Sequence, residues 1–124
     1  MAYCRWSSDS FRCDLYIYHH IRGGLAIHVA ASRHVLPDEV RSPDLRELTA
    51  NDSKEHQADW RRRYEAFHEA LDAAPIEPIG LPHAGATFMA DSGEEAVAKI
   101  AELRELGYRA PDWLESEILK EYRP

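Results

Sequence analysis

The sequence predicts an α+β fold in which an N-terminal antiparallel three-stranded meander packs against two to three C-terminal helices. Two observations carry this prediction. The first third of the chain alternates β-prone and aromatic residues around Gly23-Gly24, and the rest repeats apolar residues at helical spacing. A chain of 124 residues that is 44% apolar is long enough for one core and too short for two. We therefore expect a single domain over residues 1–124.

Residues 1–35 are predicted to form the meander. A short strand near residues 2–6 is followed by a serine-rich turn over residues 7–10, whose hydroxyl and carboxylate side chains can bond nearby backbone amides. Two β-prone runs then flank Gly23-Gly24, a pair typical of a hairpin because the favoured two-residue turns need positive φ. The three strands are expected to pair in chain order.

A turn centred on Gly23-Gly24 also fixes an expected register. It places His19 opposite His28 and Ile17 opposite Ala30. Alternation then gives one face made of Leu15, Ile17, His19, Ile21, Ala26, His28 and Ala30. The other face would hold Tyr16, Tyr18, His20, Ile27, Val29 and Ala31.

A connector over residues 36–51 leads to a predicted helix over residues 52–74. Asp52 or Ser53 can cap this helix, and Pro75 ends it. Its apolar residues recur at one face of a 3.6-residue period and are Trp60, Tyr64, Phe67 and Leu71. We expect this stripe to be buried against the sheet or against the helix that begins near Ser92.

Residues 75–91 are rich in proline and are predicted to be extended, with a short edge strand over residues 86–90. Residues 92–124 predict two helices. Ser92 and Glu95 have the spacing of a capping box, and Gly107 is suited to the left-handed position that ends a helix. Pro111 is suited to the first position of the last helix.

Charge is unevenly distributed along the chain. Residues 1–35 hold four Arg and two Asp, a balance of +2, whereas residues 36–124 hold eleven basic and twenty acidic residues, a balance of −9. An acidic surface disfavours non-specific nucleic-acid binding and suits a partner with a basic surface. The candidate partner-binding residues on the predicted helices are Glu94, Glu102, Glu105, Glu115 and Glu117. Tyr16 and Tyr18 on the sheet are the second candidate contact region.

The sequence suggests a cytoplasmic protein. No apolar run reaches the length that crosses a bilayer, and the N-terminus lacks the basic-then-apolar order of a signal peptide. Cysteines in a reducing compartment are more often free thiols than a disulfide, so Cys4 and Cys13 are expected to be unbridged.

A metal site or a small enzyme centred on the hairpin is the alternative. Facing side chains across an antiparallel pair have Cβ atoms about 5 Å apart, close enough for His19 and His28 to share a metal. Cys4 and Cys13 would be its further ligands. The sequence has no CxxC, HxxxH or HExxH spacing and no nucleophile elbow, which favours a protein without cofactor or catalytic residues.

Several segments resemble a known group of proteins. They are Tyr3-Cys4-Arg5-Trp6-Ser7-Ser8-Asp9, Cys13-Asp14-Leu15-Tyr16, Gly23-Gly24 and His28-Val29-Ala30. In these the chain resembles small uncharacterised proteins of tailed bacteriophages and prophages, closely over the first 35 residues and more loosely over Ser92–Gly107. The group has no assigned activity, so the resemblance implies a phage context and no functional residues.

Together these observations predict a non-enzymatic phage or prophage accessory protein that binds a host protein. An inhibitor of a host defence system, such as an anti-CRISPR, is one form that such a protein takes. The alternatives are the small enzyme or metal-binding protein described above and an accessory for virion assembly. The sequence does not predict an oligomeric state.

Overall fold

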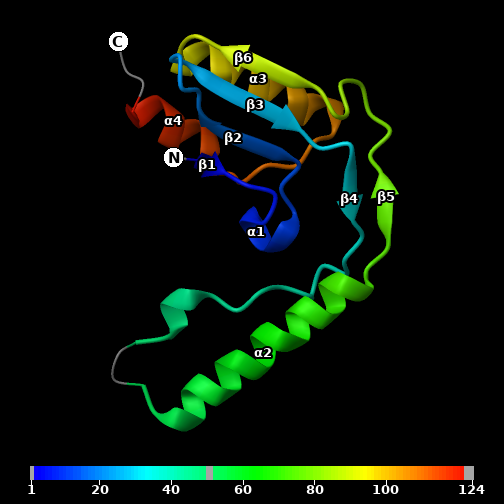
Figure 1. The fold of residues 1–124 in the computed structure, drawn as a ribbon, viewed down its shortest axis with the longest axis vertical. Helices are drawn as coiled ribbons and strands as arrows, with labels where there is room; N and C mark the ends of the chain where they lie inside the picture. Colours follow the sequence, from blue (N-terminus) through cyan, green and yellow to red (C-terminus); the bar gives the residue numbers. More distant parts are fainter. Residues whose placement is uncertain (1, 50–51, 122–124) are drawn as a thin grey trace. The chain divides into compact units, whose positions relative to one another are not determined.

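The computed structural model describes residues 2–49 and 52–121. The fold is α+β, as the sequence predicts (Figure 1). Its elements are, in order, β1 (Ala2–Cys4), α1 (Ser8–Phe11), β2 (Leu15–His19), β3 (Leu25–Val29), β4 (Ser32–His34), the 3-10 helix η1 (Leu45–Glu47), α2 (Lys54–Ala73), β5 (Ile76–Pro78), β6 (Thr87–Ala90), α3 (Gly93–Leu106) and α4 (Leu114–Glu121).

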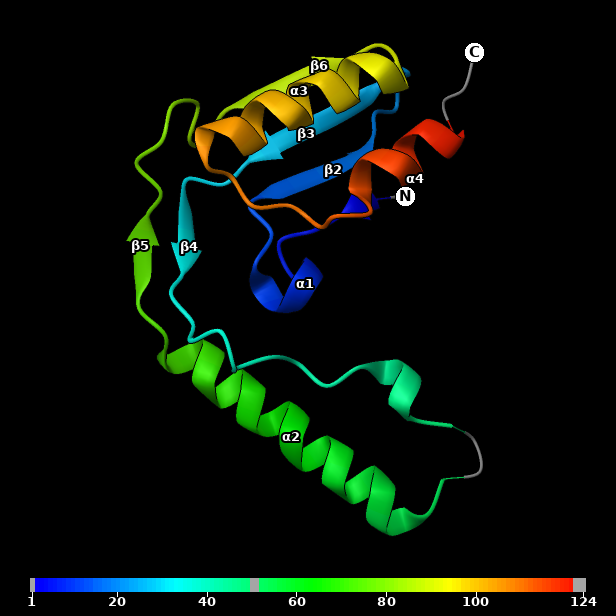
Figure 2. The same ribbon diagram turned by 180° about the vertical axis from the view of Figure 1, so that it is seen from behind.

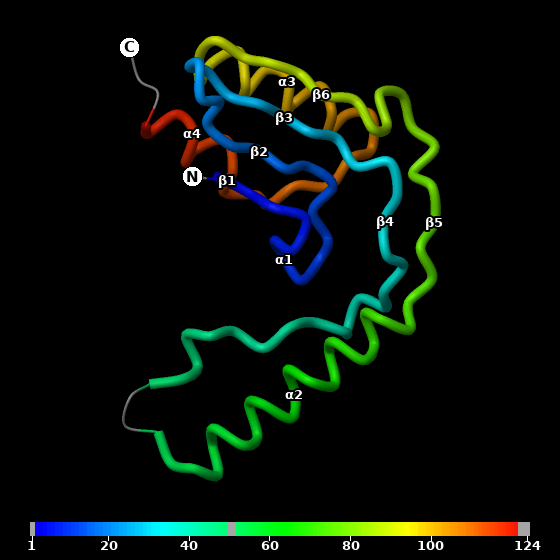
Figure 3. Tube along the Cα trace, viewed as in Figure 1, coloured from blue at the N-terminus to red at the C-terminus, as the bar shows by residue number. Residues whose placement is uncertain are grey.

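The chain divides into two compact units. Unit 1 comprises Met1–Arg33 and Glu77–Pro124, and unit 2 comprises His34–Ile76. Unit 2 contains η1 and α2, and its two ends fall within β4 and β5, which pair in a two-stranded sheet (Figure 3). The periodicity of α2 predicts an apolar stripe, but it does not reveal which part of the chain covers that stripe.

Unit 1 is built on a four-stranded antiparallel sheet with the order β1-β2-β3-β6. The predicted meander of β1, β2 and β3 is confirmed. The edge strand predicted over residues 86–90 is also confirmed, as β6 beside β3.

The register of the hairpin differs from the predicted one. His19 pairs with Leu25, and His28 pairs with Tyr16, so the prediction that His19 faces His28 is wrong. The N–H of His20 donates to the Gly24 carbonyl and the N–H of Gly23 donates to the His20 carbonyl, at 3.0 and 2.9 Å. The reversal therefore takes place over residues 21–23, ahead of the predicted centre.

This shift exchanges the two faces of β3. The alternation predicted for β2 is observed. In β3, however, Ile27 and Val29, which were predicted for the opposite face, lie on the same apolar face as Ile17. The apolar face holds Leu15, Ile17, Leu25, Ile27 and Val29, all buried. Ile21, predicted for this face, lies exposed in the turn.

Gly24 is required by its neighbour β6 as well as by the turn. Its φ is 77°, a left-handed value that glycine adopts without strain. A Cβ at this position would lie 2.5 Å from the carbonyl oxygen of Ala90. A side chain here would therefore push β6 away from the hairpin.

Helices α3 and α4 cover the apolar face of this sheet, as the view from behind shows (Figure 2). The Ser92 hydroxyl accepts from the Glu95 N–H at 3.1 Å, and Gly107 has a φ of 112°, which confirms both predicted ends of α3. Arg104 joins the two helices, because its guanidinium donates to both oxygens of the Glu115 carboxylate. The helix side of this core is formed by Ala96, Ile100, Leu103, Leu114 and Ile118.

A buried ion-paired carboxylate closes one end of unit 1. Asp14, almost fully buried, accepts from the Arg33 guanidinium at 2.7 Å and from the backbone N–H of Arg109 at 2.7 Å. The Arg109 guanidinium also contacts Asp14, at 3.2 Å. These contacts tie the start of β2 to the segment between α3 and α4 and provide the partners that a buried charge requires.

In unit 2, α2 begins and ends where the sequence predicts. The Ser53 hydroxyl accepts from the His56 N–H at 3.1 Å, and Ala74 is the last, non-helical residue before Pro75. Phe67 and Leu71 are the buried residues of this helix, while Tyr64 is exposed. The expectation that the whole stripe is buried is therefore wrong.

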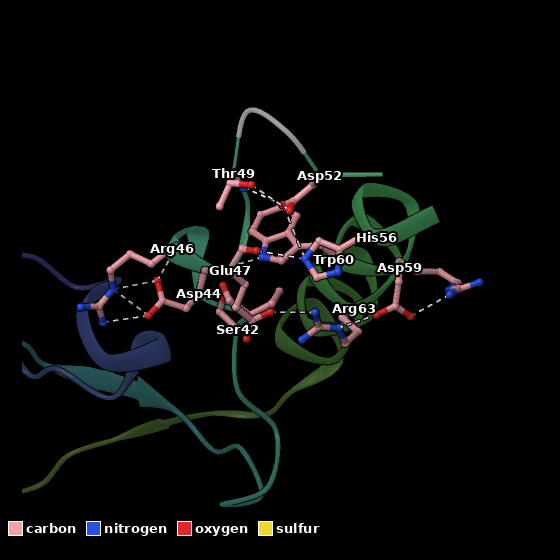
Figure 4. A network of polar contacts seen from close by, with 12 residues as sticks. Ser42, Asp44, Arg46, Glu47, Thr49, Asp52, His56, Asp59, Trp60 and Arg63 are labelled. Atoms are coloured by element: carbon pink, nitrogen blue, oxygen red, sulfur yellow. Dashed lines mark hydrogen bonds and ion pairs between the residues drawn. The ribbon is translucent and has the colours of Figure 1, made fainter. Parts of the chain in front are cut away.

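Polar contacts hold α2 to the connector of unit 2 (Figure 4). The Trp60 indole N–H donates to the Asp44 carbonyl at 2.8 Å. Arg63 bridges Glu47, at 2.7 Å, and Asp59, at 3.2 Å. Most of these groups are exposed, so water competes for the hydrogen bonds and ion pairs that hold α2 to the connector.

Candidate functional site

A row of aromatic rings runs along the sheet of unit 1, on the face turned away from α3 and α4. Tyr16 and Tyr18 come from β2, His28 from β3, and Trp6 from the segment after β1. Ring centroids are 5.5 Å apart for Trp6 and Tyr16, 6.0 Å for Tyr16 and Tyr18, and 5.3 Å for Tyr18 and His28. With Thr87 of β6, these residues form what we call the aromatic face.

The strand register puts these side chains together. Tyr16 and Tyr18 are two residues apart on β2 and so point to the same side of the sheet. Tyr16 pairs with His28, and His28 pairs with Thr87 across the next strand pair. The sheet has the order β1-β2-β3-β6, and its neighbouring strands β2, β3 and β6 carry these residues (Figure 1).

Hydrogen bonds fix the orientation of His28. Its Nδ1 lies 2.7 Å from the Thr87 hydroxyl, and its Nε2 lies 3.0 Å from the Tyr18 hydroxyl. Both ring nitrogens are therefore occupied, and the imidazole stacks on Tyr18 with 27° between the ring planes. These contacts hold the side chains of the face in one arrangement.

A shallow hollow of about 410 Å³ lies against this row. Its wall consists of the aromatic face with Val29, Gly85 and Ala86. Trp6 is 40% exposed at its border, and Tyr16, Tyr18 and His28 are half-buried. Aromatic side chains with a polar tip can bury apolar area and still hydrogen-bond, which is the chemistry of a binding surface.

Cys4 and Cys13 meet beneath the sheet. Their thiols donate to the same acceptor, the Leu15 carbonyl, at 3.3 and 3.1 Å. Both are free and buried. Interaction with Cys4 lowers the pKa of the Cys13 thiol, and interaction with Cys13, together with burial, raises the pKa of the Cys4 thiol.

The proposed metal ligands do not converge. His19 is on the opposite face from His28, where its Nε2 lies 3.1 Å from the Tyr3 hydroxyl and 3.6 Å from Glu121. In the parts of the chain that the structure describes, no three His, Cys, Asp or Glu side chains are grouped as metal ligands. The shared-metal hypothesis fails because it depends on a register that the hairpin does not adopt.

Most of the glutamates predicted as partner-binding residues form ion pairs within the protein. Glu115 pairs with Arg104 at 2.8 Å and serves the contact between α3 and α4. Glu102 pairs with Lys99 at 2.9 Å, which lowers the pKa of its carboxyl group, and Glu117 pairs with Lys120 at 3.1 Å. Glu94 and Glu105 are exposed on α3. The negative charge of these glutamates is therefore partly neutralised by neighbouring basic side chains.

Sequence reasoning did not find every residue of the aromatic face. Trp6 belongs to a recognisable aromatic group, but Thr87 contacts His28 across 59 residues of sequence, and its spacing carries no signal. Asp14, Arg33 and Arg109 were also missed as a group. Their alignment depends on long-range packing that no local pattern encodes.

Comparisons of the chain with protein-family models, curated proteins and solved structures find no match. In the part of the chain that the structure describes, none of the helices combines the length and apolar character that crossing a bilayer requires. The candidate site therefore stands on its geometry.

Proposed function

We propose that the protein is a non-enzymatic phage or prophage accessory protein that binds a host protein in the host cytoplasm through the aromatic face. The observation that carries this proposal is the row of Trp6, Tyr16, Tyr18 and His28 beside a hollow, on the sheet face away from the helices. Tryptophan and tyrosine are the residues most often found at the energetic centres of protein interfaces.

The order of the face supports a binding role. The two hydrogen bonds of His28 and its stacking on Tyr18 hold three side chains in one arrangement. Side chains that are already fixed lose little conformational entropy on association, which leaves more of the contact energy for affinity.

The acidic helices add a second, weaker element. Carboxylates such as Glu94 and Glu105 would steer the protein toward a partner with a basic surface, since long-range attraction raises the association rate. An inhibitor of a host defence complex, such as an anti-CRISPR, is the form of this activity that the phage resemblance suggests.

Two exposed tryptophans of unit 1 give a matched test. Trp6 is 40% exposed on the aromatic face, and Trp113, which immediately precedes α4, is 49% exposed. Tagged wild-type protein, Trp6→Ala and Trp113→Ala are incubated with host lysate, and the retained proteins are quantified. We expect a stoichiometric host protein that Trp113→Ala retains. Trp6→Ala should lose about thirtyfold in affinity, equivalent to about 2 kcal/mol.

Retention of the same host protein at full affinity by Trp6→Ala would contradict the proposal.

A third variant, Glu94→Lys with Glu105→Lys, measures the contribution of the helices. The affinity of this double variant for the host protein should be lower than that of the wild type near 0.1 M salt, where the Debye length is about 10 Å. The difference in affinity should vanish near 1 M salt, where the Debye length is about 3 Å. A loss larger than that of Trp6→Ala at both salt concentrations would place the main contact on α3.

A further inference from the structure

Cys4 and Cys13 form a pair that the binding function does not use. They are nine positions apart in sequence, on either side of α1, yet their sulfurs converge on one carbonyl oxygen. A buried thiol that serves only as a small apolar group needs no second thiol beside it. Two thiols whose sulfurs lie 3.3 and 3.1 Å from one shared acceptor oxygen are placed for sulfur–sulfur chemistry.

The two sulfurs are chemically unequal. Interaction with the Cys4 side chain lowers the pKa of the Cys13 thiol and so favours its thiolate form. Interaction with Cys13, together with burial, raises the pKa of the Cys4 thiol, so Cys4 keeps its proton. One nucleophilic sulfur beside one protonated sulfur is the arrangement in which the first reacts and the second resolves.

We propose that Cys4 and Cys13 are an oxidation site, at which a hydroperoxide such as hydrogen peroxide converts the two thiols into a reversible intramolecular disulfide. This inference rests on the positions of the two sulfurs and is independent of the proposed host-protein binding.

The reaction balances in two steps. The Cys13 thiolate attacks one oxygen of hydrogen peroxide, the O–O bond breaks, and Cys13 becomes a sulfenic acid while hydroxide leaves and takes a proton to become water. The Cys4 sulfur then attacks the Cys13 sulfur. The S–S bond forms, the S–O bond breaks, and the Cys4 proton leaves with the hydroxyl group as a second water. Two thiols are oxidised by two electrons, and the peroxide is reduced.

Burial selects the oxidant. Cys4 is 2% exposed and Cys13 is 5% exposed, so a bulky disulfide reagent has little access in the folded protein. Hydrogen peroxide is close to water in size and needs only a small opening. We therefore expect oxidation by peroxide to be faster than thiol exchange with oxidised glutathione at the same concentration.

The disulfide would close a loop over residues 5–12. This loop contains Trp6 of the aromatic face and the α1 turn, in which Asp9, Ser10 and Phe11 have left-handed φ values of 52°, 54° and 64°. Left-handed backbone in such residues is unfavourable and needs surrounding structure to hold it. A covalent link across its ends would restrain this turn.

The test uses the purified full chain, reduced and then exposed to hydrogen peroxide, with intact mass and peptide mapping as the readout. We expect the wild type to lose the mass of two hydrogens, to stay monomeric, to yield a peptide that links Cys4 to Cys13, and to return to its original mass with a dithiol reductant. Cys4→Ser should instead gain one oxygen at Cys13, trapped by a sulfenic-acid reagent that is added as the oxidised protein is unfolded. Cys13→Ser should remain unmodified.

The proposal would be overturned by a wild-type protein that stays reduced under peroxide, by one that gains oxygen without losing two hydrogens, or by one that forms disulfides between chains. If either serine variant fails to fold, the wild-type linked peptide decides alone. The far-ultraviolet circular dichroism of the oxidised wild type must also match that of the reduced protein, because a link formed only after unfolding would contradict a native site.

Discussion

Unit 1 and unit 2 differ in the kind of contact that stabilises each of them internally. Unit 1 encloses an apolar core between its four-stranded sheet and the helices α3 and α4. The described part of unit 2 buries two apolar side chains of α2, Phe67 and Leu71, and secures the rest of that helix with exposed polar contacts. Because apolar burial dominates stability and exposed ion pairs contribute little, we expect unit 1 to be the more stable.

The difference bears on function. The aromatic face lies on unit 1, whose opposite sheet face is fixed by the core. A binding surface on a rigid sheet keeps its shape between encounters, whereas a surface held by exposed polar contacts opens more readily. The predictions below test this contrast in order of decreasing effect.

The largest effect is expected in the core of unit 1. Leu103 is fully buried on α3 beneath the sheet, so Leu103→Ala removes apolar contacts and leaves a cavity. The free energy of unfolding, measured in urea, should fall by about 4 kcal/mol, within the usual range for buried leucine. A fall below about 1 kcal/mol would contradict a shared core of sheet and helices.

Phe67→Ala is the equivalent change in unit 2. Phe67 is buried, and the substitution should destabilise α2 by about 3 kcal/mol, the lower end of the range for buried phenylalanine. Hydrogen exchange should accelerate in the α2 amides and stay unchanged in β3. Equal acceleration in both elements would show that the two units unfold as one.

Asp14→Ala tests the polar end of unit 1. The change removes a buried carboxylate that accepts from Arg33 and from Arg109, and we expect a loss of about 2 kcal/mol in the free energy of unfolding. Asp112→Ala is the control, because Asp112 is exposed and should change stability by less than about 0.5 kcal/mol. Similar values for both variants would rule out a structural role for the buried ion pair.

Acid should loosen unit 2 before unit 1. Hydrogen bonds hold the pKa values of three unit 2 carboxylates below the ordinary value of 3.8: Asp44 accepts from Arg46, Asp52 from Thr49, and Asp59 from Arg62. A lowered folded-state pKa contributes stability that is present above 3.8 and is lost as the pH falls through the folded value. All three groups are at least partly exposed to water, so this effect is the smallest.

The loosening of unit 2 by acid can be measured from amide resonances followed by NMR during an acid titration. The signals of α2 should change below pH 3.8 while those of β3 persist. The opposite order would mean that the exposed network of Figure 4 does not support α2.

The helix ends were predictable because their signals are local. Ser53, Ser92 and Gly107 each act within one turn of their own helix, and the structure confirms all three. The hairpin register was not predictable, because Gly23-Gly24 is compatible with more than one turn. The observed turn over residues 21–23 exchanges the two faces of β3 relative to the prediction.

The candidate site was predictable only in part for the same reason. Tyr16 and Tyr18 share a face through simple alternation, which the sequence contains. His28 joins them only in the observed register, and Thr87 only through the pairing of β6 with β3. Contacts between distant segments follow from the packing of the whole unit.

Photo-crosslinking from single positions tests the central claim most directly. A photo-reactive phenylalanine analogue replaces Tyr16 on the aromatic face or, as the control, Trp113 before α4. Both proteins are irradiated in infected or expressing host cells, and the crosslinked species are identified by mass spectrometry. We predict that the analogue at position 16 captures one host protein and that the analogue at position 113 does not. Capture of that protein from position 113, with none from position 16, would contradict binding through the aromatic face.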